Sequence, residues 1–111
     1  TEAFFRIKAR YFKKWSEQKN PFHPEIWVWG AGRKTRQRAK LLEREGLKIQ
    51  GFIDIVKGKT TQKTTLHFSE IPPPGEMFIV PMVMKYGAQE LIRKNLLLRN
   101  YKEGKEFIFL A

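Results

Sequence analysis

The segment between residues 26 and 54 constrains the fold more than any other part of the sequence. A short apolar run at residues 26–29 favours a strand, and the turn Gly30-Ala31-Gly32 follows it at once. Small and apolar side chains then recur at helical spacing over residues 33–45, up to a terminating glycine. Residues 48–54 form a second predicted strand. This order, within about 30 residues, is that of a strand–helix–strand crossover, which joins two parallel strands by a right-handed connection.

The rest of the chain continues the alternation of strands and helices. Polar residues at 56–65 indicate a surface loop, and three consecutive prolines within 69–75 indicate a turn. The sequence therefore predicts an α/β fold, a small three-layer, Rossmann-like, open and mostly parallel sheet of about five strands preceded by an amphipathic helix. The further predicted elements are strands at 66–68, 77–80 and 107–110 and a helix at 87–99.

The predicted N-terminal helix, residues 2–19, is basic and carries an aromatic face that needs a partner. Packing is favoured over a membrane surface, and the sequence leaves open whether the helix packs on the domain that follows or on a preceding one. Pro21 and Pro24 end the helix. We therefore divide the chain into a linker helix from a preceding domain, residues 1–20, and a Rossmann-like domain, residues 25–111. The residues of the aromatic face are Phe4, Phe5, Ile7, Tyr11, Phe12 and Trp15.

The charge balance indicates an anionic partner. Lysine and arginine number 22 against 11 acidic residues, a formal net charge of +11 in 111 residues. Such a surface favours nucleic acid, anionic lipid or phosphorylated ligands, and an acidic neighbouring domain is an equally good explanation. The chain has no cysteine, which excludes disulfides, cysteine metal sites and thiol nucleophiles and is compatible with a cytoplasmic protein. No apolar run reaches the length of a transmembrane helix.

The glycine turn is the motif that carries chemistry. Its first glycine permits the tight turn out of the strand, and its second lets a phosphate approach the backbone at the N-terminus of the helix. Arg33 and Lys34 add positive charge there, against the helix dipole, and a bound anion would relieve that cost. Thr35 occupies the third position of the dinucleotide fingerprint, where glycine or alanine lets helix and strand pack closely. A mononucleotide or nucleotide sugar is therefore favoured over a dinucleotide.

Two further residues complete the predicted site. Asp54 ends the second strand, where an acidic side chain can accept a hydrogen bond from a ribose hydroxyl. Lys85 follows the fourth predicted strand, at the edge where open α/β sheets bind ligands. We find no nucleophile, paired carboxylates or metal-ligand set beside the turn, so no catalytic residue is assigned. The predicted ligand-binding residues are Gly30, Ala31, Gly32, Arg33, Lys34, Thr35, Asp54 and Lys85.

These residues resemble a known family. The stretch WVWGAGRKTRQRAKLLEREGLKIQGFIDI, with the later PPPGEMFIV and LLLRNYKEGKEFIFLA, resembles the small Rossmann-like domain C-terminal to some bacterial family 2 glycosyltransferases. The glycine turn and the GFID strand are also similar to the nucleotide-sugar-binding N-terminal domain of PglD-type sugar acyltransferases. By this resemblance Gly30, Gly32 and Asp54 line a nucleotide-sugar pocket, and the partner is a preceding glycosyltransferase domain. It implies a cytoplasmic location, with the inner membrane face as an alternative.

Four functions follow for comparison. The first is a non-catalytic accessory domain that binds a nucleotide or nucleotide sugar. The second is a structural or partner-docking module whose pocket is vestigial. A basic nucleic-acid-binding domain is less favoured, because the aromatic residues fall in helix stripes and strands rather than on a stacking platform. A fragment of a nicotinamide-dependent reductase is disfavoured by Thr35 and by the absence of a catalytic acid or base.

Overall fold

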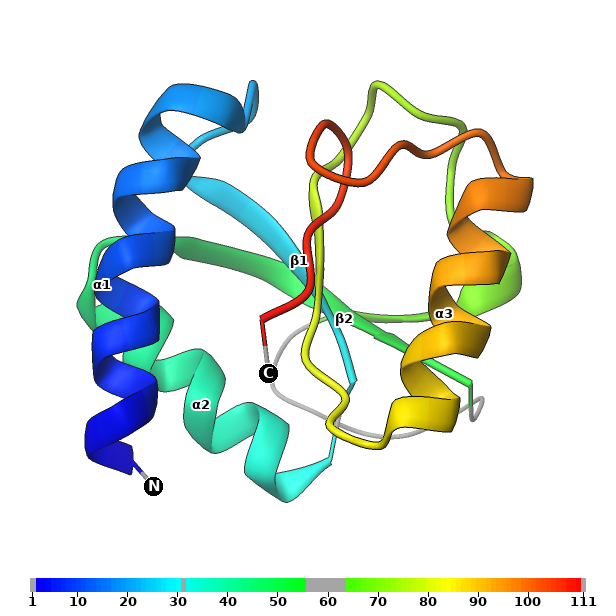
Figure 1. Cartoon of the computed structure of the whole chain (residues 1–111). Coiled ribbons are helices and arrows are strands. Elements are labelled where there is room, and N and C mark those ends of the chain that lie inside the picture. The colour runs from blue at the N-terminus through cyan, green and yellow to red at the C-terminus, as the bar shows by residue number, and fades with distance from the viewer. Residues whose placement is uncertain (1, 31, 56–63, 111) are drawn as a thin grey trace.

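The sheet has four parallel strands in the order β3-β2-β1-β4 and lies between two layers of helix. In this computed structural model, α1 and α2 cover one face and α3 covers the other (Figure 1). The α/β fold class is therefore confirmed. The structure describes residues 2–30, 32–55 and 64–110. The elements are α1 (Glu2–Lys19), β1 (Glu25–Trp29), α2 (Arg33–Arg44), β2 (Lys48–Asp54), β3 (Thr64–His67), the 3₁₀ helix η1 (Phe68–Glu70), β4 (Ile79–Pro81) and α3 (Tyr86–Leu98).

The two faces of the sheet bury separate cores, because successive side chains of a strand point to opposite faces. Ile26 and Val28 of β1 pack with α1 and α2, whereas Trp29 packs on the side of α3. The same alternation holds at β4: Phe78, just before the strand, packs with α1 and α2, and Ile79, its first residue, packs on the side of α3. Strands buried on both faces explain the nearly continuous apolar runs in the sequence.

The prediction of a fifth strand at residues 107–110 is wrong. Residues 107–110 run beside β4, but only an isolated bridge joins Ile79 to Phe107. The Ile108 N–H donates to the Ile79 carbonyl at 3.2 Å and the Leu110 N–H to the Pro81 carbonyl at 2.9 Å. The pairing is short because Pro81 has no N–H to donate in return. Most of the predicted loop at 56–65 lies outside the described residues, and Thr64 and Thr65 belong to β3.

The α1 helix packs against the domain, which answers the question that the sequence leaves open. Phe5, Ala9, Phe12 and Ser16 are buried and share a core with α2 and the sheet. The domain covers only part of the aromatic face, because three of its six residues are exposed. The six spread too widely around the helix for one neighbouring layer to cover them all. The exposed three are Phe4, Ile7 and Tyr11.

Buried polar contacts fix the end of α1 to the start of β1. The Asn20 amide, which is almost fully buried, donates to the Ser16 hydroxyl at 3.2 Å and to the Glu25 carbonyl at 3.1 Å. Its carbonyl oxygen accepts from the Phe22 N–H at 2.8 Å. The Ser16 hydroxyl also contacts the His23 Nδ1 atom at 2.7 Å. Residues 20–24 are therefore a hydrogen-bonded turn that holds helix and strand together.

Tyr101 closes the core on the side of α3 and predicts a pH-dependent stability. Its ring is 1% exposed, and its hydroxyl donates to the Pro72 carbonyl at 2.9 Å. Burial, reinforced by the Glu76 carboxylate, raises the pKa of Tyr101 to about 12. The unfolded chain loses this proton near pH 10, so the stabilisation is complete below about pH 10 and is lost as the pH rises to about 12.

The test is Tyr101→Phe, compared with the unaltered chain by denaturant unfolding at increasing pH. The variant loses one neutral hydrogen bond, so we expect it to be about 1 kcal/mol less stable at pH 7. Between about pH 10 and 12 its stability is expected to fall less steeply than that of the unaltered chain. Parallel pH profiles for the two proteins would contradict the assignment to Tyr101.

Candidate functional site

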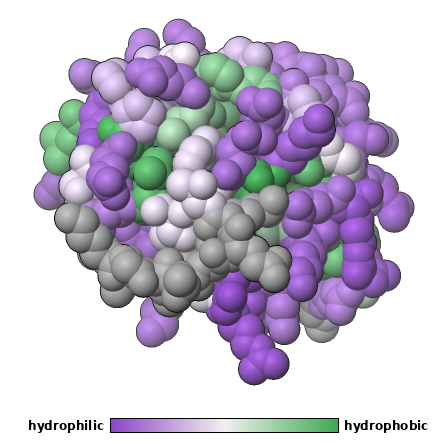
Figure 2. Space-filling view, turned by 180° about the vertical axis from the view of Figure 1, so that it is seen from behind, coloured by the Kyte–Doolittle hydropathy of each residue, from purple (hydrophilic) through white to green (hydrophobic). Residues whose placement is uncertain are grey.

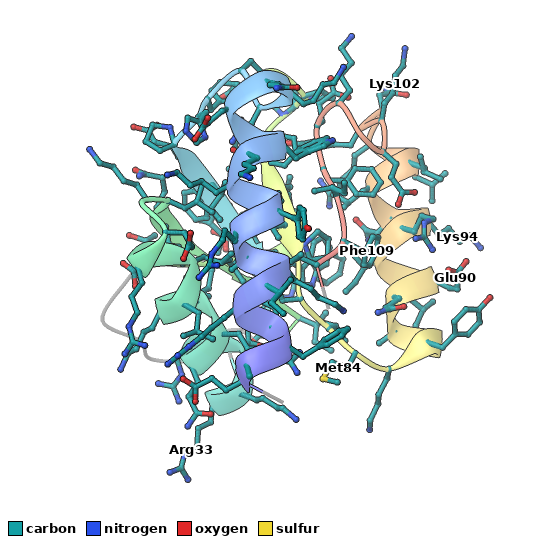
Figure 3. The ribbon with its side chains drawn as sticks, turned by 60° about the vertical axis from the view of Figure 1, so that its left-hand side comes forward. Arg33, Met84, Glu90, Lys94, Lys102 and Phe109 are labelled. Atoms are coloured by element: carbon teal, nitrogen blue, oxygen red, sulfur yellow. The ribbon has the colours of Figure 1, made fainter. Side chains whose placement is uncertain are left out.

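A cavity of about 330 Å³ lies where the carboxyl ends of the strands meet the starts of α2 and α3. Open α/β sheets bind ligands at this edge. Six of the eight predicted ligand-binding residues line it. Ala31 lies outside the described residues, and Arg33 projects away from the body into solvent (Figure 3). The cavity is lined by Gly30, Gly32, Lys34, Thr35, Arg38, Asp54, Met82, Val83, Met84 and Lys85.

Gly30 makes the turn out of β1. Its φ of +125° is a conformation that residues with a side chain rarely adopt, and its N–H donates to the Ile53 carbonyl at 2.7 Å. A Cβ atom at Gly30 would lie 3.1 Å from the Oγ1 atom of Thr35. Thr35 therefore occupies the space beside the turn that a side chain at position 30 would need. The branched side chain of Thr35 fits here because Gly30, which lies beside it, has no side chain.

The start of α2 offers backbone donors with no competing acid. Gly32 is the N-cap and provides no side-chain hydrogen bond, and the first turn contains no acidic residue. The first intrahelical bond runs from the Arg36 N–H to the Gly32 carbonyl at 3.0 Å. The N–H groups before Arg36 have no partner within the helix, and the helix dipole makes this end positive. An anion is the natural ligand for such an end.

Three cations line the cavity at this end of the helix, and sequence reasoning missed one of them. Lys34 and Lys85 were predicted, whereas Arg38 was not. Arg38 lies four residues after Lys34 and therefore on the same side of α2, which is the signal that could have found it. Its guanidinium carbon is 5.1 Å from the centre of the Phe5 ring of α1. This contact with α1 holds Arg38 beside the cavity, and the sequence alone did not predict that the two helices meet there.

Asp54 supplies the one carboxylate among the described residues that line the cavity. It is the last residue of β2, and β1 and β2 are parallel, so both strands end at the same edge as the glycine turn. The side chain is only 8% exposed, and its Oδ1 atom accepts from the Ile55 N–H at 2.7 Å. That bond fixes the carboxylate in orientation. Asp54 and the glycine turn therefore line the same cavity.

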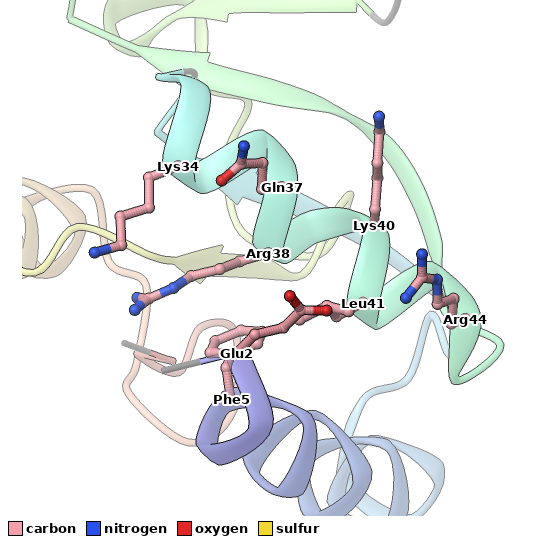
Figure 4. Close-up of a pocket in the computed structure, with 8 residues that line it drawn as sticks. All are labelled: Glu2, Phe5, Lys34, Gln37, Arg38, Lys40, Leu41 and Arg44. Atoms are coloured by element: carbon pink, nitrogen blue, oxygen red, sulfur yellow. The ribbon is translucent and has the colours of Figure 1, made fainter.

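A second groove continues from this cavity between α1 and α2. It has a volume of about 390 Å³ and shares Lys34 and Arg38 with the cavity at the turn. Figure 4 shows Lys34 and Arg38 projecting to the same side of α2, with Phe5 of α1 beneath Arg38. The other lining residues are Glu2, Gln37, Lys40, Leu41 and Arg44. The groove is therefore mainly cationic, with an apolar floor.

Within the described ranges, no three histidine, aspartate or glutamate side chains come together as a metal site needs. The two histidines of the chain lie in separate elements, His23 in the turn between α1 and β1 and His67 at the end of β3. None of the helices in the described part of the chain has the length and apolar character to span a bilayer. No protein-family model, curated protein or solved structure matches the chain.

Proposed function

We propose that the domain is a non-catalytic accessory module that binds a nucleotide or a nucleotide sugar. One observation carries the proposal: the glycine turn, three cations and the carboxylate of Asp54 line a single cavity at the ligand-binding edge of the sheet. Phosphates need backbone donors and positive charge, and a ribose needs a hydrogen-bond acceptor. The cavity supplies both kinds of group within about 330 Å³, a volume typical of small-ligand sites.

In this proposal the phosphates lie at the start of α2. The N–H groups of the first turn donate to the phosphate oxygens, and Lys34, Arg38 and Lys85 neutralise their charge. Asp54 accepts hydrogen bonds from the ribose hydroxyls. The resemblance to the accessory domain of family 2 glycosyltransferases favours a nucleotide sugar over other nucleotides. By the same resemblance, sugar transfer itself is assigned to a preceding glycosyltransferase domain.

A structural or partner-docking module is the second candidate. Met82, Val83 and Met84 line the side of the cavity that follows β4, and these side chains offer no hydrogen bond to a ligand. An apolar wall of this kind suits packing as well as it suits a nucleobase. This candidate predicts that the cavity binds no nucleotide.

The deciding measurement is an amide chemical-shift titration with UDP, UDP-sugars, NAD and coenzyme A at physiological salt. We expect saturable shifts at Gly30, Gly32 and Thr35 and near Asp54, strongest for one nucleotide. No shifts at millimolar ligand would reject the proposal in favour of the structural module.

The role of Asp54 is tested with the 2′-deoxy form of the ligand that binds. The unaltered domain is expected to bind the ribonucleotide about tenfold more tightly than its 2′-deoxy form, which is the value of one hydrogen bond to a charged group. The Asp54→Asn variant is expected to lose most of that preference.

A further inference from the structure

The outward face of α1 carries an exposed apolar stripe. Phe4, Ile7 and Tyr11 are 61%, 53% and 70% exposed, and their spacing of three and four residues places them on one side of the helix. The buried residues Phe5 and Phe12 lie on the side that faces the domain. The stripe therefore faces away from the described body, where α1 forms the outer layer (Figure 3). Large apolar side chains gathered on an outer helix indicate an interaction surface.

Basic side chains flank this stripe on both sides. At 100° per residue, Lys8 projects from one side of it, and Arg10 and Lys14 project from the other. The Lys8 ammonium lies 5.1 Å from the centre of the Phe4 ring. Ile7, Arg10, Tyr11 and Lys14 together line a shallow hollow of about 150 Å³. The outward face of α1 is therefore one surface on which an apolar stripe lies between basic side chains.

The charge of the whole chain is concentrated in the same layer. The α1 and α2 helices contain twelve basic and three acidic residues, so they hold nine of the eleven net positive charges. The third helix, α3, also exposes large apolar side chains, Leu91 and Leu98, but its charged residues are Glu90, Arg93 and Lys94. Seen from behind the view of Figure 1, the surface is mainly hydrophilic and its apolar side chains form small patches (Figure 2). Among the three α-helices that the structure describes, the layer of α1 and α2 combines an exposed apolar stripe with a high net positive charge, whereas α3 does not.

We propose that the outer face of α1 docks on an anionic lipid surface, independently of any nucleotide. A helix that lies in the interface places its apolar stripe among the acyl chains and its lysines and arginines among the headgroups, as this face would. Bases of nucleic acid fit less well, because Phe4 and Tyr11 are about 10 Å apart along the helix axis. The aliphatic Ile7 stands between them, so adjacent bases could not stack on the two rings.

Vesicle co-sedimentation tests the proposal, with phosphatidylcholine vesicles that contain or lack phosphatidylglycerol. We expect binding to the anionic vesicles alone, weakened by added salt because the headgroup attraction is screened. The variant Ile7→Ser with Tyr11→Ser removes two buried contacts with lipid, and its affinity is expected to fall by at least about tenfold. Both residues are exposed, so its thermal unfolding should match that of the unaltered chain.

The matched control is Leu91→Ser with Leu98→Ser, which removes two apolar side chains that are at least as exposed from the weakly charged α3. This variant is expected to bind vesicles as the unaltered chain does. Absence of binding to anionic vesicles, or an equal loss in both variants, would overturn the proposal. It would also fail if Ile7→Ser with Tyr11→Ser reduced binding to single-stranded RNA and left vesicle binding unchanged.

Discussion

Replacing Gly51 with alanine is expected to lower the free energy of unfolding by about 3 kcal/mol, the upper part of the usual range for overpacking a core. Gly51 lies in β2 between its two neighbours, opposite Trp27 of β1 and Thr64 of β3. A Cβ atom there would lie 2.4 Å from the Thr64 carbonyl oxygen and 2.6 Å from the Trp27 ring. The carbonyl belongs to the backbone of a paired strand, so it cannot move aside as a flexible side chain could. The register also shifts here, between Ile26 and Trp27.

Urea unfolding measures this loss, with Gly87→Ala as the matched control. Gly87 is in the first turn of α3, its φ is not positive, and no atom would come within 4 Å of an added Cβ. Alanine is favoured over glycine in a helix, so the control is expected to be unchanged or more stable by up to about 1 kcal/mol. A Gly51→Ala protein as stable as the unaltered chain would contradict the close packing of β1, β2 and β3.

Removing the charges of Lys34 and Arg38 together is expected to weaken the proposed nucleotide binding by about a hundredfold, if each charged hydrogen bond contributes about tenfold. The two residues line both the cavity at the glycine turn and the groove between α1 and α2. The test variant is Lys34→Gln with Arg38→Gln, measured by titration with the nucleotide that binds. Glutamine is a good helix former, and two fewer cations near the start of α2 relieve repulsion with the helix dipole. The folded state should therefore persist.

Lys40→Gln with Arg44→Gln is the matched control for that variant. It removes the same net charge from the same helix, but these residues line only the groove between α1 and α2. We expect its affinity to stay within about threefold of the unaltered chain, because distant surface charges are screened at physiological salt. Equal losses in the two variants would mean that the nucleotide responds to overall charge and not to the cavity at the turn.

The sequence by itself determined the central crossover and the position of the candidate site within it. The apolar run before Gly30, the helical spacing after it and the second apolar run predicted β1, α2 and β2 with little error. These signals are local, since each depends on side-chain period and on the turn residues beside it. A parallel arrangement then brings the ends of β1 and β2 to one edge, so Asp54 had to lie near the glycine turn.

Only the tertiary structure decided which surfaces those elements bury. The pattern of α1 predicted a helix, but it could not show that the domain covers Phe5 and Phe12 and leaves Tyr11 exposed. It also could not place Arg38 against Phe5, because that contact joins two helices far apart in the chain. The prediction of a final strand at residues 107–110 was wrong for the same reason, because its pairing depended on Pro81 of β4, which is distant in the sequence. Period and turn chemistry are properties of a short segment, whereas burial is a property of the neighbours that the whole fold supplies.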